Sequence, residues 1–172
     1  MSYTLTKEQI EKHNGKVVAS SGPVLLFDQI ALISGEVPRQ TPYEKGFQGE
    51  YKFKDMQWQS ASDVIDERCL IFSLKGKGIC VITGCGHTGI VNAAQHAITL
   101  LKSSKVHFIM GGVHLAGSEY AARINPTLID LERINPDFII TGHCTGRQTQ
   151  ARLSDVFDRR HVPYGVGAYL KF

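Results

Sequence analysis

The chain has 172 residues, 42% hydrophobic and 20% charged, which is enough for one domain with its own core. Its net charge is +3 with the seven histidines neutral, and the only basic cluster is Arg159-Arg160, so the charge excludes an obvious nucleic-acid partner. No apolar run approaches the roughly 18 residues that a membrane span requires, and the polar N-terminus lacks the apolar stretch of a signal peptide. The four cysteines form no C-x-x-C pair, so we expect a cytoplasmic protein with reduced thiols and no membrane contact.

Residues 1–75 are rich in turn formers and short apolar runs. Residues 24–33 are apolar except for Asp28-Gln29, which predicts a short strand pair or a strand with a turn. Residues 35–48 hold two prolines and two glycines and are expected to form a loop. Residues 69–74 form an apolar run of strand length, so the first part of the chain is expected to be strands and loops.

Residues 76–172 alternate between strand and helix patterns. Strands are predicted at 78–83, 106–110, 137–141 and 163–170, and helices at 90–101, 126–134 and 148–160. Short connections and this alternation indicate an α/β fold whose sheet is covered by helices. We therefore expect a single domain over residues 1–172.

Three glycine-rich loops, each with a histidine, follow three of the predicted strands. His87, His114 and His143 lie in these loops, and successive histidines are 27 and 29 residues apart. If the strands are parallel, all three loops lie at one edge of the sheet, where α/β proteins bind ligands. Helices begin after the first and third loops, and their free N–H groups favour an anion or a phosphate.

Several imidazoles at one edge are suited to a metal centre. Neutral imidazole is a common ligand of zinc and similar ions, and a bound metal ion activates water for hydrolysis. The alternative is that each histidine only caps or packs its own loop, which is the usual role of a single histidine after a strand. The other histidines lack this context and are expected to be structural or exposed: His13, His96, His107 and His161.

Five segments resemble the metallo-β-lactamase superfamily, and within it the dihydropterin–ribofuranosylaminobenzene-phosphate synthase-like branch. They are residues 34–39 (SGEVPR), 66–70 (DERCL), 83–92 (TGCGHTGIVN), 111–115 (GGVHL) and 141–146 (TGHCTG). The resemblance implies an αββα sandwich built from two similar halves, each a mixed sheet with helices on its outer face.

The resemblance also implies a role for each loop histidine. His87 and His143 match metal ligands that serve different ions of a binuclear site, and His114 matches a histidine expected at the substrate or near the metals, as a catalytic group. The expected cofactor is a divalent metal, with zinc first and manganese or iron as alternatives.

A small anionic or phosphorylated substrate is expected at the same edge. The predicted anion-binding residues are Arg39 in the loop over residues 35–48, Gly86 and Thr88 in the first histidine loop, and Thr145 in the third.

The superfamily's His-x-His-x-Asp-His motif is absent from this sequence. We therefore expect the chain to correspond to the C-terminal half of the fold, as one subunit of a split enzyme, as a truncated product, or as a binding protein that has lost its chemistry. The leading hypothesis is a hydrolase or pterin-related transferase component completed by an N-terminal-half chain, or by self-association. The alternatives are a non-catalytic module for small anions and a thiol role for Cys85 and Cys144.

Overall fold

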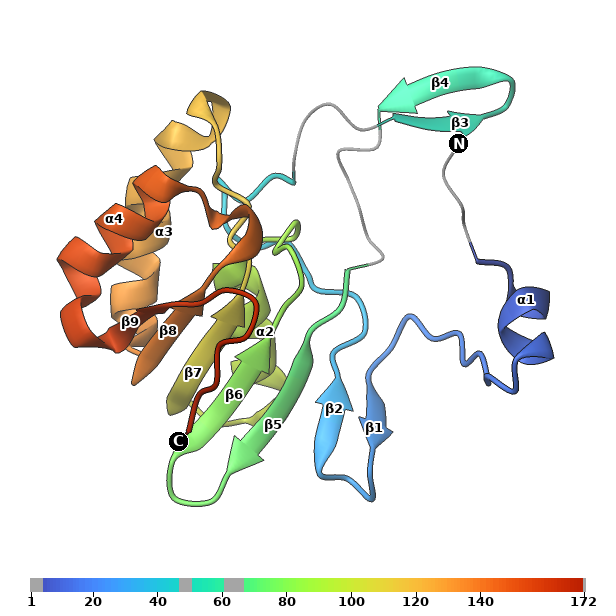
Figure 1. Cartoon of the computed structure of the whole chain (residues 1–172), viewed down its shortest axis with the longest axis horizontal. Coiled ribbons are helices and arrows are strands. Elements are labelled where there is room, and N and C mark those ends of the chain that lie inside the picture. Colours follow the sequence, from blue (N-terminus) through green and yellow to red (C-terminus); the bar gives the residue numbers. More distant parts are fainter. Residues whose placement is uncertain (1–4, 47–50, 61–66, 172) are drawn as a thin grey trace.

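The computed structural model describes residues 5–46, 51–60 and 67–171. Within them, a seven-stranded sheet is packed against helices, and a two-stranded hairpin lies apart from it (Figure 1). The sheet contains β1 (Val24–Leu26), β2 (Ala31–Ile33), β5 (Leu70–Leu74), β6 (Gly78–Ile82), β7 (Val106–Gly111), β8 (Phe138–Thr141) and β9 (His161–Pro163). The hairpin contains β3 (Tyr51–Lys54) and β4 (Gln57–Ser60), and the α-helices are α1 (Lys7–Lys12), α2 (Ile90–Leu101), α3 (Ala121–Ile134) and α4 (Arg147–Phe157).

The sheet is mixed, with the order β1-β2-β5-β6-β7-β8-β9. The pairs from β1 to β6 are antiparallel, and the pairs from β6 to β9 are parallel. The change in composition near residue 75 falls in the turn between β5 and β6, so strands from both parts of the sequence share one sheet.

Alternating residues of the central strands face two different apolar layers. One layer joins the sheet to α2, α3 and α4, and its fully buried strand residues include Ile71, Ile79, Val81, Ile109 and Ile139. This two-residue period is what a sheet with one helix-covered face requires. The predicted α/β fold with helices on one face of a mixed sheet is confirmed.

The opposite face of the sheet has its own, smaller apolar layer. Cys80, Phe108 and Ile140 are buried there, and partly buried side chains surround them. Tyr164 and Leu170, from the segment after β9, pack against this layer, and Figure 1 shows that segment crossing the face away from α2. The chain's own C-terminal segment therefore covers part of this face.

Most predicted elements are confirmed, and two are wrong. The helix predicted at 90–101 has those bounds, whereas the helix predicted at 126–134 begins at Ala121, so that Pro126 lies inside it. The strand predicted at 163–170 is wrong, because β9 covers His161–Pro163 and Gly165 and Gly167 interrupt the sequence that follows. Helix α1 and the β3–β4 hairpin were not predicted.

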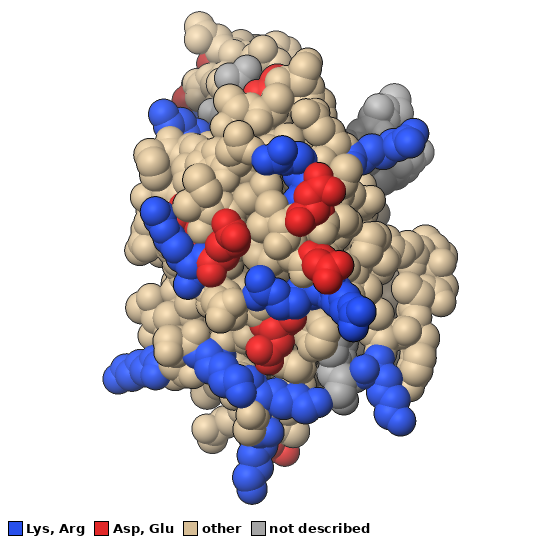
Figure 2. All heavy atoms as spheres, turned by 90° about the vertical axis from the view of Figure 1, so that its left-hand side faces the viewer, with Lys and Arg blue, Asp and Glu red and all other residues tan. Residues whose placement is uncertain are grey.

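The helical side of the molecule carries charges of both signs. Figure 2 shows lysine, arginine and acidic side chains interspersed on that side. On α3, Arg133 pairs with Asp130 at 2.7 Å. None of the helices described is long and apolar enough to cross a membrane.

Candidate metal centre

The three histidine loops lie side by side at the carboxyl ends of β6, β7 and β8, and backbone hydrogen bonds join them. The Gly112 amide donates to the Gly84 carbonyl at 2.8 Å, and the Gly142 amide donates to the Gly111 carbonyl at 3.3 Å. Because the three strands are parallel, their loops share one edge of the sheet, as the spacing of the histidines predicted.

His87 and His114 form a pair. Their rings meet edge to face, with centroids 4.6 Å apart and planes at 86°. Both line a cavity of about 20 Å³, with Glu44 and Arg123 also in its wall, which leaves room for about one water molecule. Burial lowers the pKa of His114, and the nearby charge of His87 lowers it further, so His114 is neutral near pH 7 and able to bind a metal.

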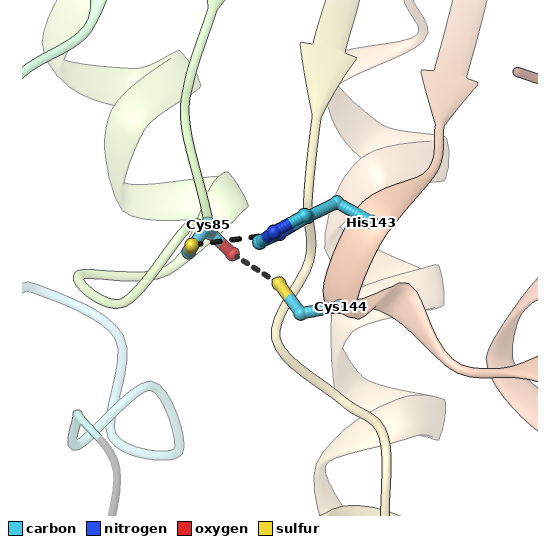
Figure 3. Close-up of side chains that lie close together, drawn as sticks. All are labelled: Cys85, His143 and Cys144. Carbon is cyan, nitrogen blue, oxygen red and sulfur yellow. Dashed lines mark hydrogen bonds between the residues drawn. The ribbon is translucent and has the colours of Figure 1, made fainter. Parts of the chain in front are cut away.

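His143 lies beside two cysteines instead. Its Nδ1 is 3.5 Å from Cys85 Sγ, and the Cys144 thiol donates to the Cys85 carbonyl at 3.0 Å (Figure 3). One ligand atom from each of these residues lies within 4.8 Å of the others. Burial raises the pKa of the Cys144 thiol to about 11, so this thiol is protonated near pH 7.

A wider groove opens beside the cysteines. It has a volume of about 510 Å³, and its wall is formed by Thr83, Gly84, Cys85, His143, Tyr164, Gly165 and Val166. Cys85 lines this groove and its neighbour Gly86 lines the His87–His114 cavity, so one loop separates the two hollows. His143 also contributes, less than burial and His87, to the lowered pKa of His114.

Two of the three loop histidines have left-handed backbones. His114 has φ 47° and His143 has φ 53°. Residues other than glycine adopt this region only when surrounding structure compensates a cost of about 1–3 kcal/mol, and such residues gather at functional sites. The strain therefore falls on two residues that the sequence singled out.

Glu67 accepts the hydrogen bonds of the loop that carries His87. Its carboxylate accepts from the Gly86 amide at 2.7 Å, from the Thr88 amide at 2.6 Å and from the Thr88 hydroxyl at 3.0 Å. These are donors that the sequence assigned to an external anion. In the structure these hydrogen bonds hold Gly86 and Thr88, the two neighbours of His87, to the segment just before β5.

Glu44 occupies the N-terminus of α2 in a similar way. Its carboxylate accepts from the Val91 amide at 3.0 Å and from the Asn92 amide at 2.9 Å, and the carboxylate is itself buried. Burial raises its pKa. The helix end that was expected to attract an anion is therefore capped by a side chain of the protein.

The other two predicted anion-binding residues are Arg39 and Thr145. Arg39 is half-buried in the loop before Glu44, next to Gln40, whose amide donates to Asn92 Oδ1 at 2.9 Å. The Thr145 hydroxyl is fully buried and donates to the Gly142 carbonyl at 2.6 Å, which stabilises the turn after β8. The anion-binding roles of these residues remain predictions.

Three of the four histidines outside the loops have structural contacts. His107 Nδ1 is 2.7 Å from Asp137 Oδ2, and His96 Nε2 is 3.1 Å from the Ser34 carbonyl oxygen. His161 lies 2.8 Å from both Thr141 Oγ1 and Ser154 Oγ. These contacts agree with the structural role predicted for all three.

The fold matches that of a solved enzyme of the β-lactamase superfamily. The crystal structure of a metal-dependent hydrolase of that superfamily superimposes with a TM-score of 0.75 at 19% identity, covering 92% of this chain and 59% of the other. The chain therefore has a metallo-β-lactamase fold, and it corresponds to somewhat more than half of that structure.

Sequence comparison points to a particular branch of the superfamily. The chain is 28% identical over 169 residues to a 7,8-dihydropterin-6-methyl-4-(beta-D-ribofuranosyl)-aminobenzene-5'-phosphate synthase of Methanocaldococcus jannaschii, covering 96% of this chain and 56% of the relative. It is 32% identical over 144 residues to an uncharacterized protein of the same organism, covering 81% of this chain and 50% of that protein. No family model matches. The predicted resemblance to the dihydropterin synthase-like branch is confirmed, and the chain spans about half the length of these relatives.

Proposed function

We propose that this chain is the C-terminal half of a metal-dependent enzyme, a hydrolase or a pterin-related transferase, that an N-terminal-half chain completes. The observation that carries the proposal is the His87–His114 ring pair, which lies beside the His143 loop at the carboxyl edge of a parallel sheet. The matched relatives, a metal-dependent hydrolase and a dihydropterin-related synthase, support the two chemistries.

The donors at this edge are suited to a divalent metal. His87 and His143 are the proposed metal ligands, and His114 is the proposed group at the substrate or near the metals. When bound, the metal would activate water or stabilise a developing oxyanion. Zinc is the first candidate, because imidazole and thiolate are the ligands that zinc prefers in proteins.

The role of His114 follows from its surroundings. Its ring packs against His87 on one side and against Tyr120 on another, with centroids 4.6 Å and 5.5 Å away. This packing holds the ring in one orientation, and burial keeps it neutral. A neutral imidazole can accept a proton from a substrate or bind the metal directly.

The non-catalytic anion-binding alternative has less support. Glu67 and Glu44 already accept hydrogen bonds from the loop and helix amides that would hold an anion. An incoming phosphate would have to displace a carboxylate that makes several short hydrogen bonds.

The apolar face of the sheet opposite the helices supports the proposal that the chain binds a partner. Partly buried side chains lie along it: Phe72, Leu74, Ile82, Met110, Phe138 and Val162. In a sandwich the two sheets bury each other's inner faces, and at about 25 cal/mol per Å² a few hundred Å² of such surface corresponds to several kcal/mol. We propose that an N-terminal-half chain covers this face, or a second copy where that chain is absent.

Light scattering of the purified chain at low micromolar concentration tests the association. The proposal predicts a dimer, or a chain that binds a hydrophobic dye and stops binding it when a polypeptide carrying His-x-His-x-Asp-His is added. A monodisperse monomer that binds no dye would contradict it. Replacing Phe72 with Ser should weaken the association, whereas replacing the exposed Ile129 on α3 with Ser should leave it unchanged.

A further inference from the structure

Two cysteines and a histidine from different loops meet at the edge of the sheet. Cys85 follows β6, and His143 and Cys144 follow β8, so the group spans the end of β7. Cys85 Sγ lies 3.5 Å from His143 Nδ1, and the three ligand atoms lie within 4.8 Å of one another (Figure 3).

These separations are close to those of a tetrahedral thiolate site. With zinc–sulfur bonds of about 2.3 Å, two sulfur ligands of one ion lie roughly 3.8 Å apart, and a sulfur and a nitrogen ligand slightly less. From separations of at most 4.8 Å, side-chain rotations that move the ligand atoms by about 1 Å would bring them to these distances. Cys69 and Cys80 have no comparable geometry, since both are buried within the fold.

The backbone between the two cysteine loops is built for their close approach. A Cβ atom placed on Gly112 would lie 2.6 Å from Cys144 Sγ and 2.9 Å from the Cys85 carbonyl oxygen, both closer than real Cβ contacts. Any other residue at this position would push the loops apart. His143, which directly precedes Cys144, has a left-handed backbone conformation with φ 53°.

We propose that Cys85, Cys144 and His143 form a binding site for a thiophilic cation such as Zn²⁺, with the fourth coordination position open to the groove. Two thiolates and an imidazole select soft or borderline ions. Each thiol releases its proton to solvent when the metal binds, and two thiolates neutralise a divalent ion. The Cys144 sulfur then exchanges its hydrogen bond to the Cys85 carbonyl for the metal.

The groove beside Cys85 and His143 would leave the fourth coordination position of the metal open. The groove of about 510 Å³ reaches Cys85 and His143 and is otherwise lined by Thr83, Tyr164 and their glycine and valine neighbours. Three protein ligands and one exchangeable ligand are typical of zinc sites that bind water or substrate. This site is built by the present chain alone and does not depend on an N-terminal-half partner, although it shares His143 with the proposed function.

Cobalt substitution tests the site in the 172-residue chain. The chain is stripped of metal, kept reduced with a phosphine, and titrated with Co²⁺, which gives a near-ultraviolet charge-transfer band only when thiolates bind it. We expect one equivalent of Co²⁺ to produce the band, and Zn²⁺ to remove it. Cys85→Ser and Cys144→Ser should each weaken the band, and the double variant should abolish it, whereas the buried Cys80→Ala should retain it.

A second measurement needs no variant. Alkylation followed by mass spectrometry should modify Cys85 and Cys144 in the metal-free chain, and one equivalent of Zn²⁺ should slow both modifications together. Absence of the band, a band that survives both serine substitutions, or zinc that protects neither thiol would each overturn the proposal. Cobalt bound without the thiolate band and lost in His87→Ala would also overturn it, because the metal would then lie at the histidines and not at the thiols.

Discussion

Glu67 provides the most direct test of how the His87 loop is held. Its carboxylate accepts three hydrogen bonds, from the amides of Gly86 and Thr88 and from the Thr88 hydroxyl, at 2.6–3.0 Å. Bonds to an ionised acceptor contribute about 1.5–3 kcal/mol each. Glu67 is itself half-buried, so water can reach part of the site after truncation, and we expect Glu67→Ala to lower the free energy of unfolding by about 2–4 kcal/mol.

Urea denaturation followed by far-ultraviolet circular dichroism measures this loss. Glu67→Gln keeps one accepting oxygen and should lose roughly half as much as Glu67→Ala. Glu132→Ala, at an exposed position on α3, is the matched control and should change the free energy of unfolding by less than about 0.5 kcal/mol. If Glu67→Ala were no more destabilising than this control, the loop would be held by other contacts and the argument would fail.

Two further substitutions test the packing and the pH dependence of the fold. Gly112→Ala should cost about 1–3 kcal/mol by separating Cys85 from Cys144, whereas Gly84→Ala, whose added methyl group meets nothing within 4 Å, should be nearly neutral; chemical denaturation compares them. Burial lowers the pKa of His161 below the ordinary imidazole value of about 6.5, so its contribution to stability is complete above about pH 6.5 and is lost as the pH falls through the folded pKa. His161→Gln should therefore lose less free energy of unfolding than the parent between about pH 7.5 and pH 5; equal losses would show that His161 does not titrate as described.

The parallel part of the sheet could be predicted because its signals are local. Each apolar run is followed by a glycine-rich turn and then by a helical pattern, and α2 has the predicted bounds. The final strand was predicted at residues 163–170, whereas β9 covers His161–Pro163, so the prediction began where the strand ends. In the structure the Tyr164 amide still donates to the Thr141 carbonyl at 3.0 Å, but the glycines that follow end the pairing.

Two of the missed elements had signals in the sequence. Helix α1 begins with a capping box, in which Thr6 and Gln9 exchange hydrogen bonds of 2.8 Å and 3.2 Å, and this pattern is visible in the sequence. The β3–β4 hairpin pairs Phe53 with Trp58 around Asp55-Met56, an alternation that a strand search could have found.

The sequence predicted that the three histidine loops lie at one edge of the sheet, but not which side chains of these loops lie together. The three histidine loops were identified because each follows a strand and contains glycine. His87 lies against His114, and His143 lies beside Cys85. These pairs depend on the directions of side chains in loops, which no periodic pattern in the sequence indicates. Glu67 was missed for a similar reason, because it contacts a loop 19 residues away through backbone amides that any sequence possesses.

We propose that His87 binds metal only when a second chain completes the site. The decisive measurement is the metal content per chain, by elemental mass spectrometry after dialysis, of this chain alone and in complex with a polypeptide that carries His-x-His-x-Asp-His. We expect the complex to retain more metal than the isolated chain. His87→Ala should remove this excess, whereas His13→Ala, at an exposed position outside the site, should not. An equal metal content in the two samples, or an excess that survives His87→Ala, would contradict it.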